Sequence, residues 1–207
     1  MKNERIIKTG TTTVGLVGKD SVVLASDRRA TMGYLIASKD IDKIYPIDKH
    51  IGMTIAGSVG DAQTLIRWMS AELKLYELKH SKKASIQAAA TLLANILAGH
   101  KYYPFWVQIL LGGYDSKPRL YSIDMLGGVT EEKLTSTGSG SPIAYGVIED
   151  LYTDNATVHE NLLIAAKAVT SAMKRDAASG ERVDLVVIDK NGFQRMRKED
   201  VKKIIES

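Results

Sequence analysis

The sequence contains no cysteine among its 207 residues. It can therefore form no disulfide, offers no thiolate nucleophile and cannot bind a metal through cysteine, and nothing indicates an oxidising compartment. Long hydrophobic runs are also lacking, since nowhere do the roughly 18 uncharged apolar residues of a membrane span follow one another. The first ten residues lack the apolar segment of a secretory signal, having only Ile6 and Ile7 as large apolar side chains. We therefore expect a cytoplasmic protein that does not enter a membrane.

A strong net charge is lacking as well. The chain has 28 Lys and Arg against 24 Asp and Glu, for a net charge of +4, and without residues 1–10 the balance is 25 to 23, or +2. A nucleic-acid-binding domain would need clustered basic residues beside aromatic faces on a strand, so we expect no nucleic-acid partner. With 44% hydrophobic and 25% charged residues, the composition is that of one ordinary folded domain.

Signatures of metal and phosphate sites are missing too. The four histidines have no partner at helical spacing and no H-E-x-x-H motif, so surface or capping roles are expected for them. Gly57 and Gly60 give only G-x-x-G, which is not the spacing of a phosphate-binding loop. We expect neither a metal ion nor a cofactor.

Hydrophobic periodicity predicts strands and helices in separate runs. Short β-rich segments predict strands, helical spacing of apolar residues predicts helices, and Gly112 and Gly113 have the composition of a turn. A serine and proline start the third helix, and Thr157 with Glu160 matches the capping box of the fourth. The expected order is strands at 14–17, 21–26, 44–47 and 51–56, helices from 61 and at 84–99, strands at 106–111 and 119–123, helices from 141 and 157, strands at 183–188 and 193–196, and a short charged helix.

Segregated runs of this kind favour antiparallel sheets with helices packed outside, because a parallel βαβ fold would alternate strands and helices. The fold class expected is α+β, as a four-layer α-β-β-α sandwich in one domain.

The segment around Thr11 carries the most chemical information. Its simplest interpretation is a glycine followed by the threonine-rich start of a strand. The functional alternative is that cleavage after Gly10 exposes Thr11 as a new N-terminus, whose α-amine can act as general base for its own hydroxyl. That amine has an unperturbed pKa of about 7.7 to 8, near the working pH that a general base requires. An internal threonine has only an amide there, which explains why a short polar leader, residues 1–10, would be encoded.

Six motifs resemble the active β-subunit of the archaeal-type proteasome, a threonine hydrolase family, from Thr11 to about Asp189. They are Gly10 to Gly15, Ser26 to Arg29, Lys43, Thr54 to Gly57, Ser136 to Ser141, and Arg175 to Gly180. The resemblance implies the N-terminal-nucleophile hydrolase fold, removal of residues 1–10 and a catalytic domain at 11–207.

The resemblance also implies roles for single residues. Asp27 and Lys43 would flank the nucleophile, and Lys43 would be the cation that lowers the pKa of the Thr11 hydroxyl and amine. The alternative is that the same two residues form a surface ion pair, worth about 1 kcal/mol at most. Gly57 would offer its N–H to the oxyanion. Three further residues would hydrogen-bond around the threonine amine: Ser139, Asp176 and Ser179.

Substrate would add as a β-strand near Thr31 and Gly57, as the resemblance implies. The matching pocket positions are apolar, so a chymotrypsin-like preference for large hydrophobic side chains is expected. These positions are Ala30, Ala37, Ile41, Ile55 and Val59.

The partners implied are other β-subunits in a seven-membered ring, rings of α-subunits, a regulatory ATPase and unfolded polypeptide substrate. A non-catalytic β-type ring subunit is the alternative, but such a subunit typically lacks the threonine, the lysine or the leader glycine. Another alternative is the bacterial two-ring relative, whose first strand usually departs from the Thr11 to Gly15 pattern.

Overall fold

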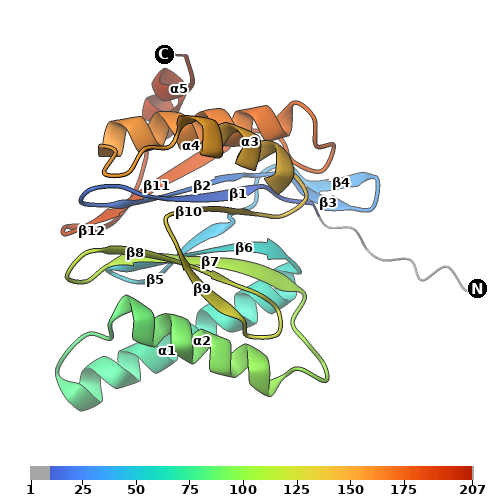
Figure 1. Cartoon of the computed structure of the whole chain (residues 1–207). Coiled ribbons are helices and arrows are strands. Elements are labelled where there is room, and N and C mark those ends of the chain that lie inside the picture. Colours follow the sequence, from blue (N-terminus) through green and yellow to red (C-terminus); the bar gives the residue numbers. More distant parts are fainter. Residues whose placement is uncertain (1–9, 207) are drawn as a thin grey trace, which may run out of the picture.

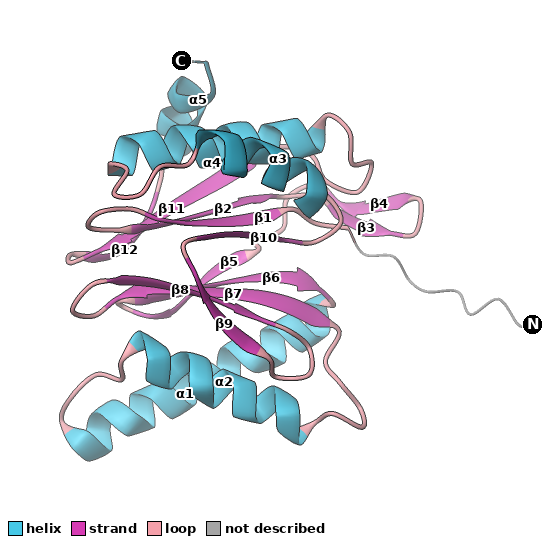
Figure 2. Ribbon diagram, in the orientation of Figure 1, coloured by secondary structure: helices cyan, strands magenta, loops and turns pink. Residues whose placement is uncertain are grey.

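The structure is a computed structural model that describes residues 10–206. Most of the expected leader therefore lies outside the described residues, and Gly10 is its only described member. Two antiparallel sheets lie face to face and helices cover both outer faces, which makes four layers (Figures 1 and 2). The predicted α+β fold, a four-layer α-β-β-α sandwich, is confirmed.

The first sheet has the strand order β10-β1-β2-β11-β12. Its long central strands are almost entirely buried because helices cover one face and the second sheet covers the other. The bounds are β1 Thr13–Val17, β2 Val22–Asp27, β10 Leu134–Thr137, β11 Val183–Asp189 and β12 Gly192–Arg195.

The second sheet has the order β5-β6-β7-β8-β9. A separate two-stranded sheet, β3-β4, extends beyond the end of the first sheet (Figure 1). Strands β3, β4, β9 and β10 lie outside the predicted segments. The bounds are β3 Ala30–Met32, β4 Leu35–Ser38, β5 Ile44–Asp48, β6 Ile51–Gly57, β7 Val107–Tyr114, β8 Pro118–Ile123 and β9 Val129–Glu132.

Helices α1 and α2 pack on the second sheet, and α3 and α4 pack on the first, with α5 against α4 and β11. Serine side chains cap α1 and α2, and the capping box predicted for α4 is present. The N-cap of α3 is Gly140, one residue before the predicted serine. The bounds are α1 Val59–His80, α2 Ile86–Gly99, α3 Ser141–Leu151, α4 Val158–Met173 and α5 Lys198–Glu206.

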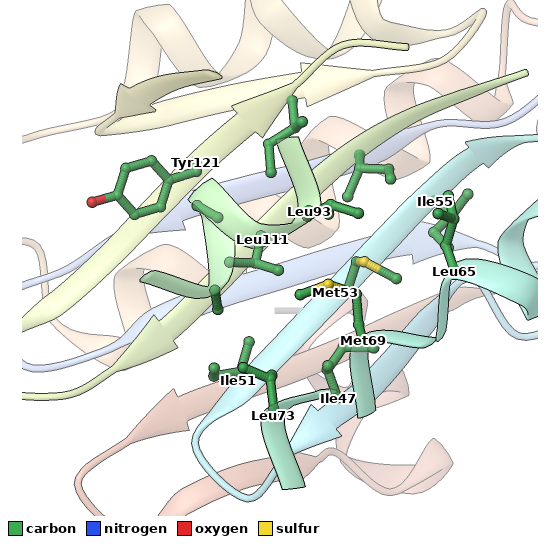
Figure 3. Close-up of a cluster of buried hydrophobic side chains, with 14 of the residues drawn as sticks. Ile47, Ile51, Met53, Ile55, Leu65, Met69, Leu73, Leu93, Leu111 and Tyr121 are labelled. Atoms are coloured by element: carbon green, nitrogen blue, oxygen red, sulfur yellow. The ribbon is translucent and has the colours of Figure 1, made fainter. Parts of the chain in front are cut away.

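Three hydrophobic clusters hold the layers together. One fills the space between α1, α2 and the second sheet, where Met53, Met69 and Leu93 are fully buried (Figure 3). A second lies between α4 and the first sheet, and a third, around Leu24 and Leu110, lies between the two sheets. The helix stripes predicted from the sequence thus face the sheets.

The prediction of a turn at Gly112 and Gly113 is wrong, because β7 runs through both residues. The absent side chains make room for neighbouring layers: a Cβ on Gly112 would lie 2.8 Å from Cγ1 of Val22, and one on Gly113 would lie 2.4 Å from Cδ1 of Ile86. His50 also departs from its expected surface role. It is buried, and its Nε2 lies 2.9 Å from the carbonyl oxygen of Ala84.

Within residues 10–206, no helix has the length and hydropathy that crossing a membrane requires.

Candidate active site

The candidate site lies where the start of β1 meets the ends of β2 and β10, with β6 of the second sheet facing them. Thr13, at the start of β1, pairs with Ser26 near the end of β2 and with Thr137 at the end of β10. Across the sandwich, the hydroxyl of Thr54 in β6 donates to Oγ1 of Thr13 at 3.2 Å. Segments far apart in the sequence therefore meet around the residues that precede β1.

Thr11 lies in this region and is only 5% exposed. Its hydroxyl donates to the carbonyl oxygen of Gly10 at 2.7 Å, and its backbone N–H donates to Oγ of Ser139 at 3.2 Å. The N–H of Gly10 donates to Oγ1 of Thr31 in β3 at 2.9 Å. The peptide bond between Gly10 and Thr11 is thus held on both sides, with a hydroxyl beside its carbonyl group.

Asp27, at the end of β2, is fully buried and accepts four hydrogen bonds. Its Oδ1 accepts from Nζ of Lys43 at 2.7 Å and from the backbone N–H of Thr12 at 2.9 Å. Its Oδ2 accepts from the backbone N–H groups of Arg29 and Gly180, each at 3.0 Å. The carboxylate therefore links the start of β1, the segment before β5 and the segment before β11, which a surface ion pair would not do.

Lys43 is 5% exposed and lines the same pocket as Thr11. Burial lowers the pKa of its ammonium group below 10.5, against the opposing effect of the Asp27 and Asp176 charges. The charge of Arg29 lowers it further. A cation with a lowered pKa beside a threonine is typical of a functional site.

Asp176, beyond the end of α4, organises a second group of side chains. Its Oδ2 accepts from the hydroxyls of Ser139 at 2.6 Å and Ser179 at 2.7 Å. Oγ of Ser179 lies 2.7 Å from Oγ1 of Thr12. A chain of hydrogen bonds therefore connects Asp176 through Ser139 to the backbone nitrogen of Thr11.

Gly57 ends β6 and lines the pocket beside Thr11. Its φ angle is +136°, and a Cβ there would lie 2.0 Å from the carbonyl oxygen of Trp106. Only glycine fits this conformation and this contact.

The pocket beside Thr11 includes most of the residues predicted to contact substrate. Ala37 is the exception, since it is exposed on β4 and is not among the lining residues. The lining consists of Gly10, Thr11, Ala30, Thr31, Ile41, Asp42, Lys43, Tyr45, Ile55, Gly57, Val59 and Ala62.

Sequence reasoning missed Tyr45 as a pocket residue. Its hydroxyl donates to the carbonyl oxygen of Asp42, and burial raises the pKa of the phenol. The signal available was nearness in sequence, because Tyr45 follows Lys43 by two residues at the start of β5. Because the hydroxyl is hydrogen-bonded within the protein, the tyrosine ring forms a largely apolar part of the pocket wall.

Comparison with known proteins places the chain in a family. The model of the proteasome subunit family matches residues 7–188. The chain is 52% identical over 204 residues to the proteasome subunit beta of Methanosarcina thermophila, which covers 98% of this chain and 97% of that protein. It is 53% identical over 205 residues to the proteasome subunit beta of Methanococcoides burtonii, with the same coverage of 98% and 97%. It is 48% identical over 192 residues to the proteasome subunit beta 2 of Aeropyrum pernix, covering 93% and 88%. The motifs around Thr11, the sandwich of two sheets and these matches agree, and the chain belongs to the proteasome subunit family.

Proposed function

We propose that this chain is a catalytic β-subunit of an archaeal-type proteasome core particle, a threonine-type endopeptidase with Thr11 as its nucleophile. One observation carries the proposal: the hydroxyl of Thr11 lies 2.7 Å from the carbonyl oxygen of Gly10. The buried pair of Lys43 and Asp27 and the pair of Ser139 and Asp176 stand around the same residue. Threonine catalysis needs an activated nucleophile with a base in reach, so these neighbours of Thr11 support the proposal.

The first step is removal of the leader, residues 1–10. Oγ1 of Thr11 gives up its proton and attacks the carbonyl carbon of Gly10. The C–N bond between the two residues then breaks as the nitrogen takes up a proton in place of the one that the hydroxyl lost. The product is an ester between Gly10 and the Thr11 hydroxyl with a free α-amine. Water then hydrolyses the ester, releasing the leader with a carboxylate on Gly10 and restoring the hydroxyl.

Peptide hydrolysis uses the amine that this step creates. The amine takes the proton from Oγ1, which attacks the substrate carbonyl, and the N–H of Gly57 stabilises the oxyanion. The amine then gives its proton to the leaving nitrogen, and water hydrolyses the ester. Lys43 lowers the pKa of the Thr11 hydroxyl by its charge, and Ser139 with Asp176 orients the amine.

We propose that cleavage follows large hydrophobic residues. Five apolar side chains line the pocket: Ala30, Ile41, Ile55, Val59 and Ala62. Asp42 also lines it, but its carboxylate is paired with Arg28 and Arg195. A charged substrate side chain would be desolvated here without a free partner, at a cost of several kcal/mol.

The proposal extends to assembly with other β-type subunits in a seven-membered ring, with rings of α-subunits in the cytoplasm, and with a regulatory ATPase that delivers unfolded polypeptide. Supporting it are large apolar side chains exposed on the β3–β4 hairpin and on α1, because clustered exposed apolar residues mark interaction surfaces. They include Met32, Tyr34, Leu35, Leu75 and Leu78.

The experiment is to produce the chain with an archaeal α-subunit and assay size-exclusion fractions for hydrolysis of fluorogenic peptides ending in Tyr, Arg or Glu. We expect activity in the assembled fraction only, highest after Tyr. Assembly without hydrolysis would support the non-catalytic ring subunit instead.

A further inference from the structure

A cluster of ion pairs adjoins the candidate site. At its centre is Arg28, the residue after Asp27, which is only 7% exposed. Its Nε donates to Oδ1 of Asp40 at 2.5 Å, and its Nη1 donates to Asp42 and to Asp184. Three carboxylates from two different parts of the chain thus meet on one guanidinium group.

Two further arginines complete the cluster. Nη1 of Arg195 lies 2.5 Å from Asp184 and 3.2 Å from Asp42, and Nη2 of Arg182 lies 2.6 Å from Asp40. Three positive and three negative charges therefore balance one another, so removal of one member leaves the cluster with an unbalanced charge.

The cluster fixes the segment that carries Lys43. Residues 39–43 connect β4 to β5 and form neither helix nor strand. The backbone N–H of Ile41 donates to the carbonyl oxygen of Arg28 at 3.0 Å, and the carbonyl oxygen of Lys43 accepts from Ile55 at 3.0 Å. Without regular structure, this segment depends on such contacts for its position.

The residues of the segment serve both the ion-pair cluster and the pocket. Asp40 and Asp42 bind Arg28, and Ile41, Asp42 and Lys43 line the pocket beside Thr11. Two consecutive residues, Asp27 at the end of β2 and Arg28 just after it, therefore hold one segment at two points. Asp27 binds the Lys43 ammonium group at 2.7 Å, and Arg28 binds the acidic residues.

We infer that Arg28 is a positioning residue for hydrolysis, which holds residues 40–43 so that Lys43 stays against Asp27 and beside Thr11. Arginine suits this task because its planar, forked donors can serve several carboxylates at once, whereas lysine presents a single compact charge. The inference rests on the proposed function.

The test compares assembled particles carrying Arg28→Met, Arg28→Lys or Asp42→Asn with the wild type. The control is Arg119→Met, which removes an arginine with two acidic partners, Asp115 and Glu131, on the other sheet. Active sites are titrated with a peptide electrophile that reacts covalently with the N-terminal threonine, so that kcat is measured per functional site. KM and the pH profile of kcat/KM are measured alongside.

For Arg28→Met we expect kcat per titrated site to fall by about tenfold to 100-fold, the cost of misplacing a catalytic group. The alkaline limb of the kcat/KM profile of Arg28→Met should move to lower pH. The reason is that the Asp27 charge raises the pKa of Lys43, and this effect weakens when Lys43 is held less firmly against Asp27. Arg28→Lys should restore part of kcat, Asp42→Asn should shift both quantities in the same direction by less, and Arg119→Met should change neither.

Wild-type kcat per site with an unchanged alkaline limb in Arg28→Met would overturn the inference and leave the proposed function intact. If Arg28→Met fails to assemble, Asp42→Asn decides by the same two readouts. An inactive wild-type particle would overturn both proposals.

Discussion

Nζ of Lys43 lies 2.7 Å from Oδ1 of Asp27, and neither side chain is more than 6% exposed. Because water cannot reach these buried charges to replace a lost partner, each charge depends on the other for its compensation. Both residues contribute to the surroundings of Thr11, Asp27 through the backbone of Thr12 and Lys43 as a wall of the pocket.

Lys43→Ala should therefore lower kcat by more than about tenfold, equivalent to about 1.4 kcal/mol of barrier. It should also cost about 3 to 5 kcal/mol of folding stability, since the Asp27 carboxylate stays buried without its ion-pair partner. The measurements are kcat per titrated site and urea unfolding of the full chain. Lys74→Ala is the control, because Lys74 forms an exposed pair with Glu77. A variant that keeps more than a tenth of wild-type kcat would show that the assigned role is wrong.

The pH dependence of kcat/KM should report the same lysine. The acid limb should reflect the Thr11 amine, whose unperturbed pKa is about 7.7 to 8. Lys43 is a cation below its pKa and loses that charge as pH rises through it. Because burial lowers this pKa below 10.5, activity should fall at a lower pH than an exposed lysine would give. In Lys43→Arg the side chain stays charged, so any remaining activity should lack the alkaline limb. An alkaline limb at the same pH in both proteins would assign it to another group.

Gly10→Ala should block or strongly slow removal of the leader. A Cβ on Gly10 would lie 1.7 Å from Cβ of Ala178, a distance that no packed pair of carbon atoms can adopt. The Gly10 carbonyl would have to leave its place beside the Thr11 hydroxyl. Intact mass over time gives the rate of removal.

The double variant Gly10→Ala with Ala178→Gly is the matched test, because it removes the clashing methyl group. The remaining neighbours would be Cα of Ala178 at 2.9 Å and Oγ of Ser139 at 3.0 Å, so partial recovery is expected. Equal rates in the single and double variants would mean that the clash does not control cleavage.

Asp115 offers a prediction on stability away from the site. Its carboxylate accepts from the N–H groups of Ile86 at 3.1 Å and Ser116 at 2.6 Å, which ties the β7–β8 turn to the start of α2. Asp115→Ala should cost about 1 kcal/mol in urea unfolding, because it removes the acceptor of an N–H in the first turn of α2, much as the loss of an N-cap side chain does. Asp20→Ala, in an exposed turn, is the control.

The pH dependence of this effect has a definite sign. Burial raises the pKa of Asp115, but the hydrogen bonds from Ile86, Ser116 and Lys117 outweigh it and hold the pKa below 3.8. The unfolded chain therefore binds the proton more tightly, and the stabilisation is present above the unfolded pKa and is lost as pH falls through the folded one. The wild type and Asp115→Ala should differ in unfolding free energy at neutral pH and converge in acid. A difference in unfolding free energy that stays constant at all pH values would show that the charge of the Asp115 carboxylate is not what stabilises the start of α2.

Much of the fold could be predicted from the sequence because, in long segments, the periodic spacing of apolar residues indicates both the element and its buried face. The stripes of α1 and α4 are examples, as is the capping box at Thr157. The β3–β4 hairpin and β9 were missed because their residues are largely exposed and lack the alternation of a strand with one buried face. Gly112 and Gly113 were misassigned because composition cannot distinguish a turn from a strand that needs close packing.

The site was predicted from family motifs and threonine chemistry, not from spacing. Sixteen residues separate Asp27 from Lys43, and 128 separate Thr11 from Ser139, and neither interval predicts a contact. The ion pairs of Arg28 were beyond sequence reasoning for the same reason, since Asp184 lies 156 residues away. The pairing of β2 with β11 brings Asp184 close to Arg28.

The central claim is that Thr11 becomes a free N-terminal residue and then acts as the nucleophile. Its most direct test is intact mass together with N-terminal sequencing of catalytically active particles, with Thr11→Ala prepared in parallel. The account predicts active wild-type chains that begin at Thr11, and Thr11→Ala chains that assemble, keep residues 1–10 and do not hydrolyse peptides. Active particles whose chains all retain residues 1–10 would contradict it.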